Sequence, residues 1–262
     1  MSDATASPPA TGRSADGPGR SARLTRGIGA QIRSFVRTPL NLLLLVALPV
    51  VVVEGYGIAM EAFPHLPGIQ TESLVAMGRV NGAIYAVAFF AGVLGLFQVI
   101  SARQADRRLG LCGYSRLELF GTRLLTVIVG CLVITAASLA VLARTTTITA
   151  PLSAFAGLAL AAVIYGAIGM LVGAVLPRAL EGSLVIVFLV DFDDFLSSGM
   201  LNIDTAVLSA FPLHFPHRMV RDAVFEGAVA TGDAAGAVAY ALVALLIAAL
   251  IYARVTAGGV GQ

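Results

Sequence analysis

Long apolar runs recur along the chain, separated by shorter polar segments rich in glycine, proline or arginine. A helix needs roughly 20 predominantly apolar residues to cross a bilayer. Six runs meet that length: 40–60, 80–102, 124–143, 152–176, 183–203 and 235–253. The pattern therefore predicts an all-α polytopic membrane protein with six transmembrane helices.

The fifth run differs from the others because it contains Asp191, Asp193 and Asp194. On an unbroken helix, Asp191 and Asp194 point about 60° apart, while Asp193 points to nearly the opposite side. A carboxylate at membrane depth usually faces water or the interior of the helix bundle. Either the helix breaks at this point, or the three aspartates have different roles.

Two segments precede the first run. Residues 1–22 are rich in Ser, Pro, Gly and Ala without an apolar period, so we expect a disordered tail before a transmembrane domain over 23–262. Residues 23–38 have the pattern of an amphipathic helix lying in the membrane interface. The apolar side of this helix would carry Leu24, Ile28, Ile32, Phe35 and Val36, and its far side Arg26, Arg33 and Arg37. A plain positively charged membrane anchor is the alternative interpretation.

The composition and the placement of charge agree with a membrane protein. The chain is 58% hydrophobic and 12% charged, whereas a soluble domain is about 25% charged. All 17 basic residues are arginine, and 13 of them fall on the cytoplasmic side if the N-terminus is inside, while the other four, Arg79, Arg144, Arg218 and Arg221, fall in external loops. Arginine is retained in the cytoplasm near span ends. We therefore expect a multi-pass protein of the cytoplasmic (plasma) membrane with both termini cytoplasmic, and the net charge of +2 gives no reason to expect nucleic acid as a partner.

The segment 103–123, between the second and third runs, is too long and too patterned for a simple turn. Gly110 and Gly113 are expected to break the helix. Ser115 can then cap a new short helix, with Glu118 three residues later completing a capping box. Such a break followed by a short helix suits a docking surface under a membrane domain, although the arginines of this segment could serve only to fix the topology.

Taken together, these features resemble the permease subunit of an ABC type-2 exporter. The resemblance rests on the basic helix ending in Arg37-Thr38-Pro39, the six runs, the Arg/Gly-rich segment 103–123 and the segments Phe-Leu-Ser-Ser-Gly-Met-Leu at 195–201 and Phe-Pro-Leu-His-Phe-Pro-His-Arg-Met-Val-Arg at 211–221. It covers nearly the whole chain after residue 22. The aspartates of the fifth run depart from the family, in which that span is usually apolar.

The resemblance implies a division of labour between two kinds of subunit. A P-loop ATPase needs a lysine in its nucleotide-binding motif, and this chain contains no lysine. We therefore expect no enzymatic activity and no bound cofactor in this chain, with ATP and Mg on a separate ABC ATPase subunit at the cytoplasmic face. The resemblance assigns the dock to the interfacial helix and to Arg107, Arg108, Leu109, Tyr114, Arg116 and Glu118.

The resemblance also implies a pathway for efflux, enclosed by a second permease copy in a homodimer or heterodimer. The chain would turn back into the membrane after the fifth span, as a re-entrant external segment that begins near Ser197 and Ser198. Asp191 and Asp194 would then line a water-filled outer gate together with these serines. Arg218, Arg221 and His217 are the possible partners of the aspartates.

Two other classes of function stay open. In a proton- or ion-coupled secondary transporter, intramembrane acids such as Glu54 and Asp191 would be essential, but such carriers commonly show repeated halves and none is evident here. A non-transporting membrane scaffold is the third possibility. The Asp-x-Asp-Asp spelling at 191–194 also occurs in some cyclases, but no second acidic motif accompanies it.

The remaining candidate residues favour structural interpretations. Cys112 and Cys131 show neither disulfide nor metal-site spacing. His214 and His217 could bind a metal, but two histidines with prolines between them more often pack at an interface. Small residues in the fourth run allow close approach of helix backbones, in the same copy or in a second one: Gly157, Ala161, Ala162, Gly166, Gly169 and Gly173.

Overall fold

The computed structural model describes residues 39–62, 71–111, 116–176, 178–198 and 205–258. These residues form eight helices and, within the described ranges, no strand. The helices are α2 (Pro39–Glu61), α3 (Thr71–Leu111), α4 (Arg116–Thr145), α5 (Pro151–Val175), α6 (Ala179–Ser197), α7 (Thr205–Leu208), α8 (His214–Phe225) and α9 (Thr231–Gly258). The tail 1–22 and the expected interfacial helix 23–38 lie outside the described residues.

The prediction of an all-α membrane protein is confirmed at the level of helix length and composition. Four described segments are long and apolar enough to cross a membrane: Leu74–Ala102, Leu119–Thr145, Pro151–Val175 and Thr231–Arg254. They belong to α3, α4, α5 and α9. The first and fifth predicted spans correspond to α2 and α6, and six spans stay a prediction. Helix α6 ends at Ser197, not at residue 203, and its 19 residues include four acids.

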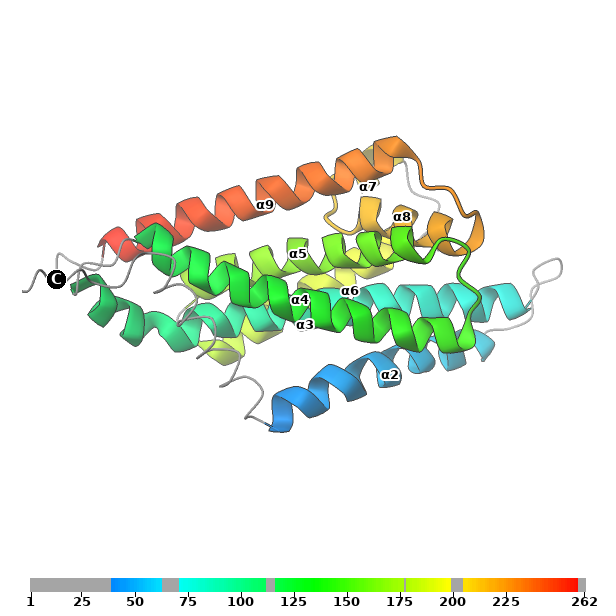
Figure 1. Ribbon diagram of the computed structural model, residues 1–262, viewed down its shortest axis with the longest axis horizontal. Helices are drawn as coiled ribbons and strands as arrows, with labels where there is room; N and C mark the ends of the chain where they lie inside the picture. The colour runs from blue at the N-terminus through cyan, green and yellow to red at the C-terminus, as the bar shows by residue number, and fades with distance from the viewer. Residues whose placement is uncertain (1–38, 63–70, 112–115, 177, 199–204, 259–262) are drawn as a thin grey trace, which may run out of the picture.

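Helices α3 and α5 form the centre of the bundle (Figure 1). Their backbones approach each other closely. A Cβ atom at Gly169 would lie 1.9 Å from the carbonyl oxygen of Gly92, and one at Gly95 would lie 2.2 Å from the carbonyl oxygen of Gly166. Only glycine fits where two backbones meet this closely. Gly169 and Gly173 of α5 therefore pack against α3, and Gly157 packs against α8 of the same chain, which is one of the two alternatives that the sequence left open.

The segment between the second and third runs follows the prediction in part. Helix α3 ends at Leu111, one residue after Gly110, and a new helix, α4, begins at Arg116, directly after Ser115, but α4 is long and runs without interruption to Thr145. No separate short helix exists in the described part of this segment. Residues 103–109 include arginine, glutamine, alanine and leucine, which are strong helix formers, whereas one interior glycine costs only about 1 kcal/mol.

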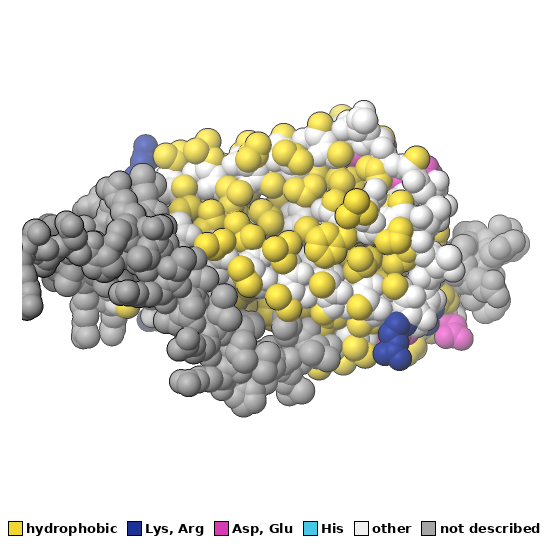
Figure 2. Space-filling view, in the orientation of Figure 1, with side chains coloured by type: hydrophobic (Ala, Val, Ile, Leu, Met, Phe, Trp, Pro, Cys, Tyr) yellow, Lys and Arg dark blue, Asp and Glu magenta, His cyan; other side chains and the backbone are white. Residues whose placement is uncertain are grey.

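The bundle has two distinct ends (Figure 1). The C-terminal ends of α3 and α9 lie at the left in that view, and α7, α8 and the connection from α4 to α5 lie at the right. Between these ends, the visible face is covered mainly by hydrophobic side chains (Figure 2). Exposed apolar side chains along the helices, among them Leu242, Leu246 and Leu250 of α9, are typical of a surface that contacts lipid.

The short helix α8 is the element that places polar side chains inside this apolar bundle. It packs against α5, α9, α3 and α6. Its buried residues include His214 and His217, and Leu213 immediately before it is fully buried. The segment after the fifth run is thus folded onto the bundle, and its relation to the membrane surface stays a prediction.

Candidate functional site

Helix α6 carries the three aspartates on two different sides. The helix is unbroken through Ser197, and the backbone N–H of Ser198 closes it by donating to the carbonyl oxygen of Asp194 at 2.8 Å. Asp193 is 1% exposed and Asp194 is 4% exposed, whereas Asp191 is exposed to the surroundings of the chain. The sequence raised two possibilities, a broken helix or different roles for the three aspartates. In the structure the helix is continuous and the aspartates lie in different environments.

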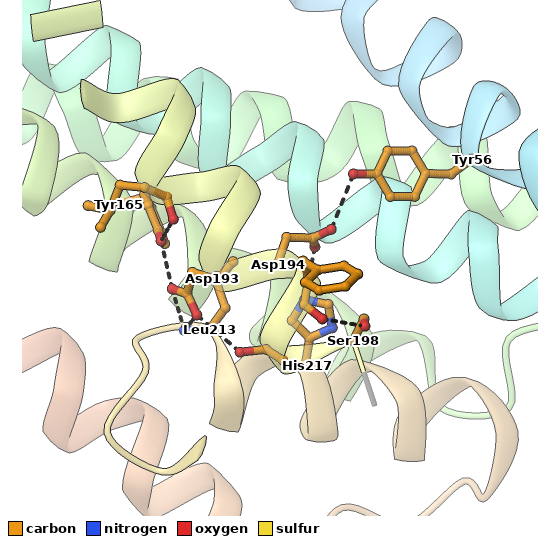
Figure 3. Close-up of polar contacts among 10 residues, drawn as sticks. Tyr56, Tyr165, Asp193, Asp194, Ser198, Leu213 and His217 are labelled. Carbon is orange, nitrogen blue, oxygen red and sulfur yellow. Dashed lines mark hydrogen bonds and ion pairs between the residues drawn. The ribbon is translucent and has the colours of Figure 1, made fainter. Parts of the chain in front are cut away.

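Asp193 connects α6 to α5 and to the start of α8 (Figure 3). The Tyr165 hydroxyl donates to Asp193 Oδ2 at 2.6 Å, and the Ser197 hydroxyl donates to Oδ1 at 3.0 Å. The backbone N–H of Leu213 lies 3.1 Å from Oδ2 and 3.3 Å from Oδ1. A buried carboxylate needs such donors because leaving it unpaired is costly.

Asp194 connects the same turn of α6 to α8 and α2. His217 Nε2 lies 3.0 Å from Asp194 Oδ1, and both side chains are 5% exposed. The Tyr56 hydroxyl of α2 donates to Asp194 Oδ2 at 3.2 Å (Figure 3). Of the three partners considered for the aspartates, His217 is therefore confirmed. Two neighbouring carboxylates thus join α6 to three other helices.

Asp191 lies on the same side of α6 as Asp194, as their spacing of three residues predicts. Tyr56 of α2 and Tyr85 of α3 both lie near the carboxylates of Asp191 and Asp194. The Tyr56 and Tyr85 ring centroids are 5.7 Å apart, and Tyr85 stacks on Phe89 at 6.0 Å with an interplanar angle of 8°. The exposed carboxylate of Asp191 therefore stands beside a row of aromatic rings that extends from α2 along α3.

The exposed face of α6 around Asp191 is otherwise apolar. Phe188, Phe192 and Phe195 are 71%, 59% and 53% exposed. We define the acid–aromatic face as Asp191 with these three phenylalanines of α6 and with Tyr56 and Tyr85. A carboxylate on such a face needs water or protein opposite it, because isolating it in hydrocarbon costs several kcal/mol.

The two arginines considered as partners of the aspartates have other acids beside them. Arg218 Nε lies 3.1 Å from Asp233 Oδ2, and Arg221 Nε lies 3.9 Å from Asp222 Oδ1. Burial raises the pKa of Asp222, and the neighbouring Glu226 acts in the same direction. The arginines of α8 therefore belong to the contacts of α8 and α9, away from the carboxylates of α6.

Glu54 also has a partner that the sequence analysis did not identify. Arg79 lies 3.2 Å from Glu54 Oε2 and joins α3 to α2, with both side chains partly exposed. Arg79 was expected in a loop before the second span, but α3 already begins at Thr71. The loop assignment is wrong because an arginine paired with a carboxylate can lie inside an apolar helix.

Several other predicted site residues have no described side chain. Arg107, Arg108 and Leu109 lie in the last turns of α3, and Arg116 and Glu118 in the first turn of α4. Tyr114, Cys112 and the interfacial residues Arg26, Arg33 and Arg37 lie outside the described residues. The proposed dock therefore stays a prediction.

The histidine and cysteine side chains within the described part of the chain have local contacts. No group of three or more His, Cys, Asp or Glu residues there could hold a metal ion. Burial lowers the pKa of His214, and Arg218 beside it acts in the same direction. Cys131 is fully buried and donates to the carbonyl oxygen of Ala162 at 3.4 Å.

The sequence analysis missed Tyr56, Tyr85 and Tyr165, which surround the aspartates. Their signal is a hydroxyl-bearing aromatic residue inside an apolar run, because a buried tyrosine hydroxyl usually needs a hydrogen-bond partner. No protein-family model matches the chain, and no curated protein matches it.

Proposed function

We propose that this chain is the transmembrane permease subunit of an ATP-driven exporter of the ABC type-2 kind, with a separate ATPase subunit at its arginine-rich end. The acid–aromatic face is the observation that carries the proposal. A pathway through a membrane needs a surface that tolerates both water and apolar cargo, and this face combines an exposed carboxylate with exposed aromatic rings.

The acid–aromatic face is incomplete in one copy of the chain. Asp191 is exposed in the C-terminal half of α6, where the other exposed side chains are apolar. A second permease copy opposite this face would enclose Asp191 in a shared, water-containing space and remove it from lipid. This supports a dimer in which the pathway runs between the two copies, with Asp191 at its outer part and Asp194 holding α6 in place behind it.

The opposite end of the bundle supplies the expected dock. Helix α3 has 41 residues and is therefore about 60 Å long, whereas the hydrocarbon core is about 30 Å thick. Its last turns contain Arg103, Arg107 and Arg108, and α4 begins nearby at Arg116. A helical hairpin that extends beyond the bilayer with several arginines presents a charged surface to a cytoplasmic partner.

Co-purification of an ATPase with the full chain tests the proposal. The tagged chain, extracted in mild detergent from its own cells, should bring down a second polypeptide and vanadate-sensitive ATP hydrolysis. Replacing 106–116 with a Gly/Ser linker of equal length should abolish both, whereas replacing 228–230 at the other end of the bundle should abolish neither. A chain that purifies without any ATPase under these conditions contradicts the proposal.

A secondary transporter is the second candidate, and the buried contact between Asp194 and His217 favours it. A histidine in contact with a carboxylate inside a helix bundle, here beside the acid–aromatic face, is a pairing that proton-coupled carriers use. Such a carrier would need no ATPase, and its transport would follow an imposed pH gradient. A scaffold would show neither ATP dependence nor gradient dependence.

A further inference from the structure

A surface groove lies where α4 ends and α5 begins, away from the acid–aromatic face. Its volume is about 760 Å³, within the range of about 300–1,000 Å³ that is common for ligand sites. The residues that line it include Ala136, Ala140, Arg144, Thr146, Pro151 and Phe155. It is open to the outside along one side.

The groove is apolar along α4 and polar at its mouth. Alanine and leucine side chains of α4 line one wall, and Phe155 of α5 lines the other. These residues belong to segments that are apolar enough to cross a membrane. The mouth, at residues 144–147, lies where both segments end.

The mouth is lined by Arg144 and several threonine hydroxyl groups, and Arg79 of α3 reaches it by donating to the carbonyl oxygen of Thr145 at 3.4 Å. Arg144 is exposed and makes no ion pair with any residue that the structure describes. The Thr146 hydroxyl is buried and has no hydrogen-bond partner among the described residues. Pro151, which also lines the mouth, is the first residue of α5, and the N-terminus of a helix favours anions. The mouth therefore offers donors without offering a carboxylate.

We propose that this groove holds one phospholipid of the surrounding bilayer, with its phosphate at Arg144 and Thr146 and one acyl chain along Ala136 and Ala140. Arginine matches phosphate because its guanidinium can donate two parallel hydrogen bonds. The apolar floor fits an acyl chain. A protein partner would need an anionic group to complement Arg144, whereas every phospholipid brings a phosphate to this depth.

Native mass spectrometry of the purified full chain, with phosphatidylglycerol added in detergent, tests the proposal. The wild-type chain should retain one lipid more per copy than Arg144→Gln. Because the variant loses charge-assisted hydrogen bonds to the phosphate, it should bind phosphatidylglycerol about tenfold or more weakly. Arg144→Lys should retain only part of the binding, because the charge is kept while the two parallel hydrogen bonds of the guanidinium are lost. Arg254→Gln, which changes an exposed arginine near the other end of the bundle, should bind like the wild type.

Further arms separate the phosphate from the acyl chain. Ala140→Phe should fill the groove and remove the same lipid while leaving Arg144 in place. Diacylglycerol, which lacks the phosphate, should not compete with phosphatidylglycerol at this site, and inorganic phosphate alone should not displace it. Equal lipid retention in Arg144→Gln and wild type would overturn the proposal. A change from dimer to monomer in Ala140→Phe would also overturn it, because the groove would then hold a second copy of the chain.

Discussion

Replacing Asp194 with asparagine should destabilise the helix bundle even before any effect on transport is considered. The substitution keeps the shape of the side chain but removes the charge that faces His217 Nε2 at 3.0 Å and the Tyr56 hydroxyl at 3.2 Å. Both the aspartate and the histidine are 5% exposed, so water cannot replace the lost contacts. Asp194→Asn therefore tests whether this carboxylate holds α6 against α8 and α2.

The expected loss follows from the two contacts. A buried hydrogen bond to a charged group contributes about 1.5–3 kcal/mol, and Asp194 makes one contact of this kind to α8 and one to α2. Since asparagine can still accept from Tyr56, we expect a loss of about 3 kcal/mol. In a chain of this size, that loss corresponds to a fall of roughly 6–12 °C in melting temperature.

Cys131 provides a built-in reporter for this measurement. Its thiol is fully buried and becomes reactive only when the bundle opens, so a thiol-reactive dye can follow melting in detergent in a Cys112→Ser background. In the double variant Asp194→Asn/His217→Gln, the loss of unfolding free energy should be smaller than the sum of the two single losses, because the two side chains interact directly. Unchanged melting of Asp194→Asn, together with lost transport, would refute this reasoning and favour Asp194 as a gate residue.

Three further predictions concern other parts of the molecule. Gly169→Ala should prevent assembly of the bundle or lower its melting temperature strongly, because the new Cβ would lie 1.9 Å from the Gly92 carbonyl oxygen; Gly121→Ala, where nothing lies within 4 Å, should be neutral or stabilising by up to about 1 kcal/mol. Asp191→Asn should change the free energy of unfolding by no more than about 0.5 kcal/mol yet alter ATP hydrolysis by the complex. A large shift in melting temperature would contradict an exposed carboxylate. Because burial lowers the pKa of His214, the unfolded chain takes up a proton that the folded chain resists, so stability should fall as the pH drops below about 6.5. His214→Gln should reduce this loss, as measured by melting between pH 8 and pH 5, and an unchanged slope would contradict the assignment.

The sequence predicted those features that depend on apolar length and helical geometry. Continuous apolar runs located the long helices, and the spacing of the aspartates correctly separated Asp193 from the side that carries Asp191 and Asp194. It did not reveal the tyrosines, because Tyr165 in an apolar helix is indistinguishable from a core phenylalanine until a carboxylate from another helix is known to face it.

Partners that are distant in the chain explain the other errors. Arg79 was assigned to a loop because its counter-charge, Glu54, lies on another helix and cannot be paired with it from sequence alone. The second span was expected to end at residue 102, but the strong helix formers that follow extend α3 to Leu111. The end of an apolar run is weak evidence for the end of a helix when the residues beside it are strong helix formers.

The central claim is that ATP hydrolysis by a partner subunit changes the acid–aromatic face of this chain. The most direct test replaces Asp191 with cysteine in a Cys112→Ala/Cys131→Ala background and measures its reaction with a membrane-impermeant thiol reagent in the co-purified complex. A cysteine in place of Leu152, which is 82% exposed on α5, serves as the control. The proposal predicts that trapping with ATP and vanadate changes the rate at position 191 several-fold and leaves the control rate unchanged. A rate at position 191 that ignores ATP, or that follows an imposed pH gradient instead, would contradict it.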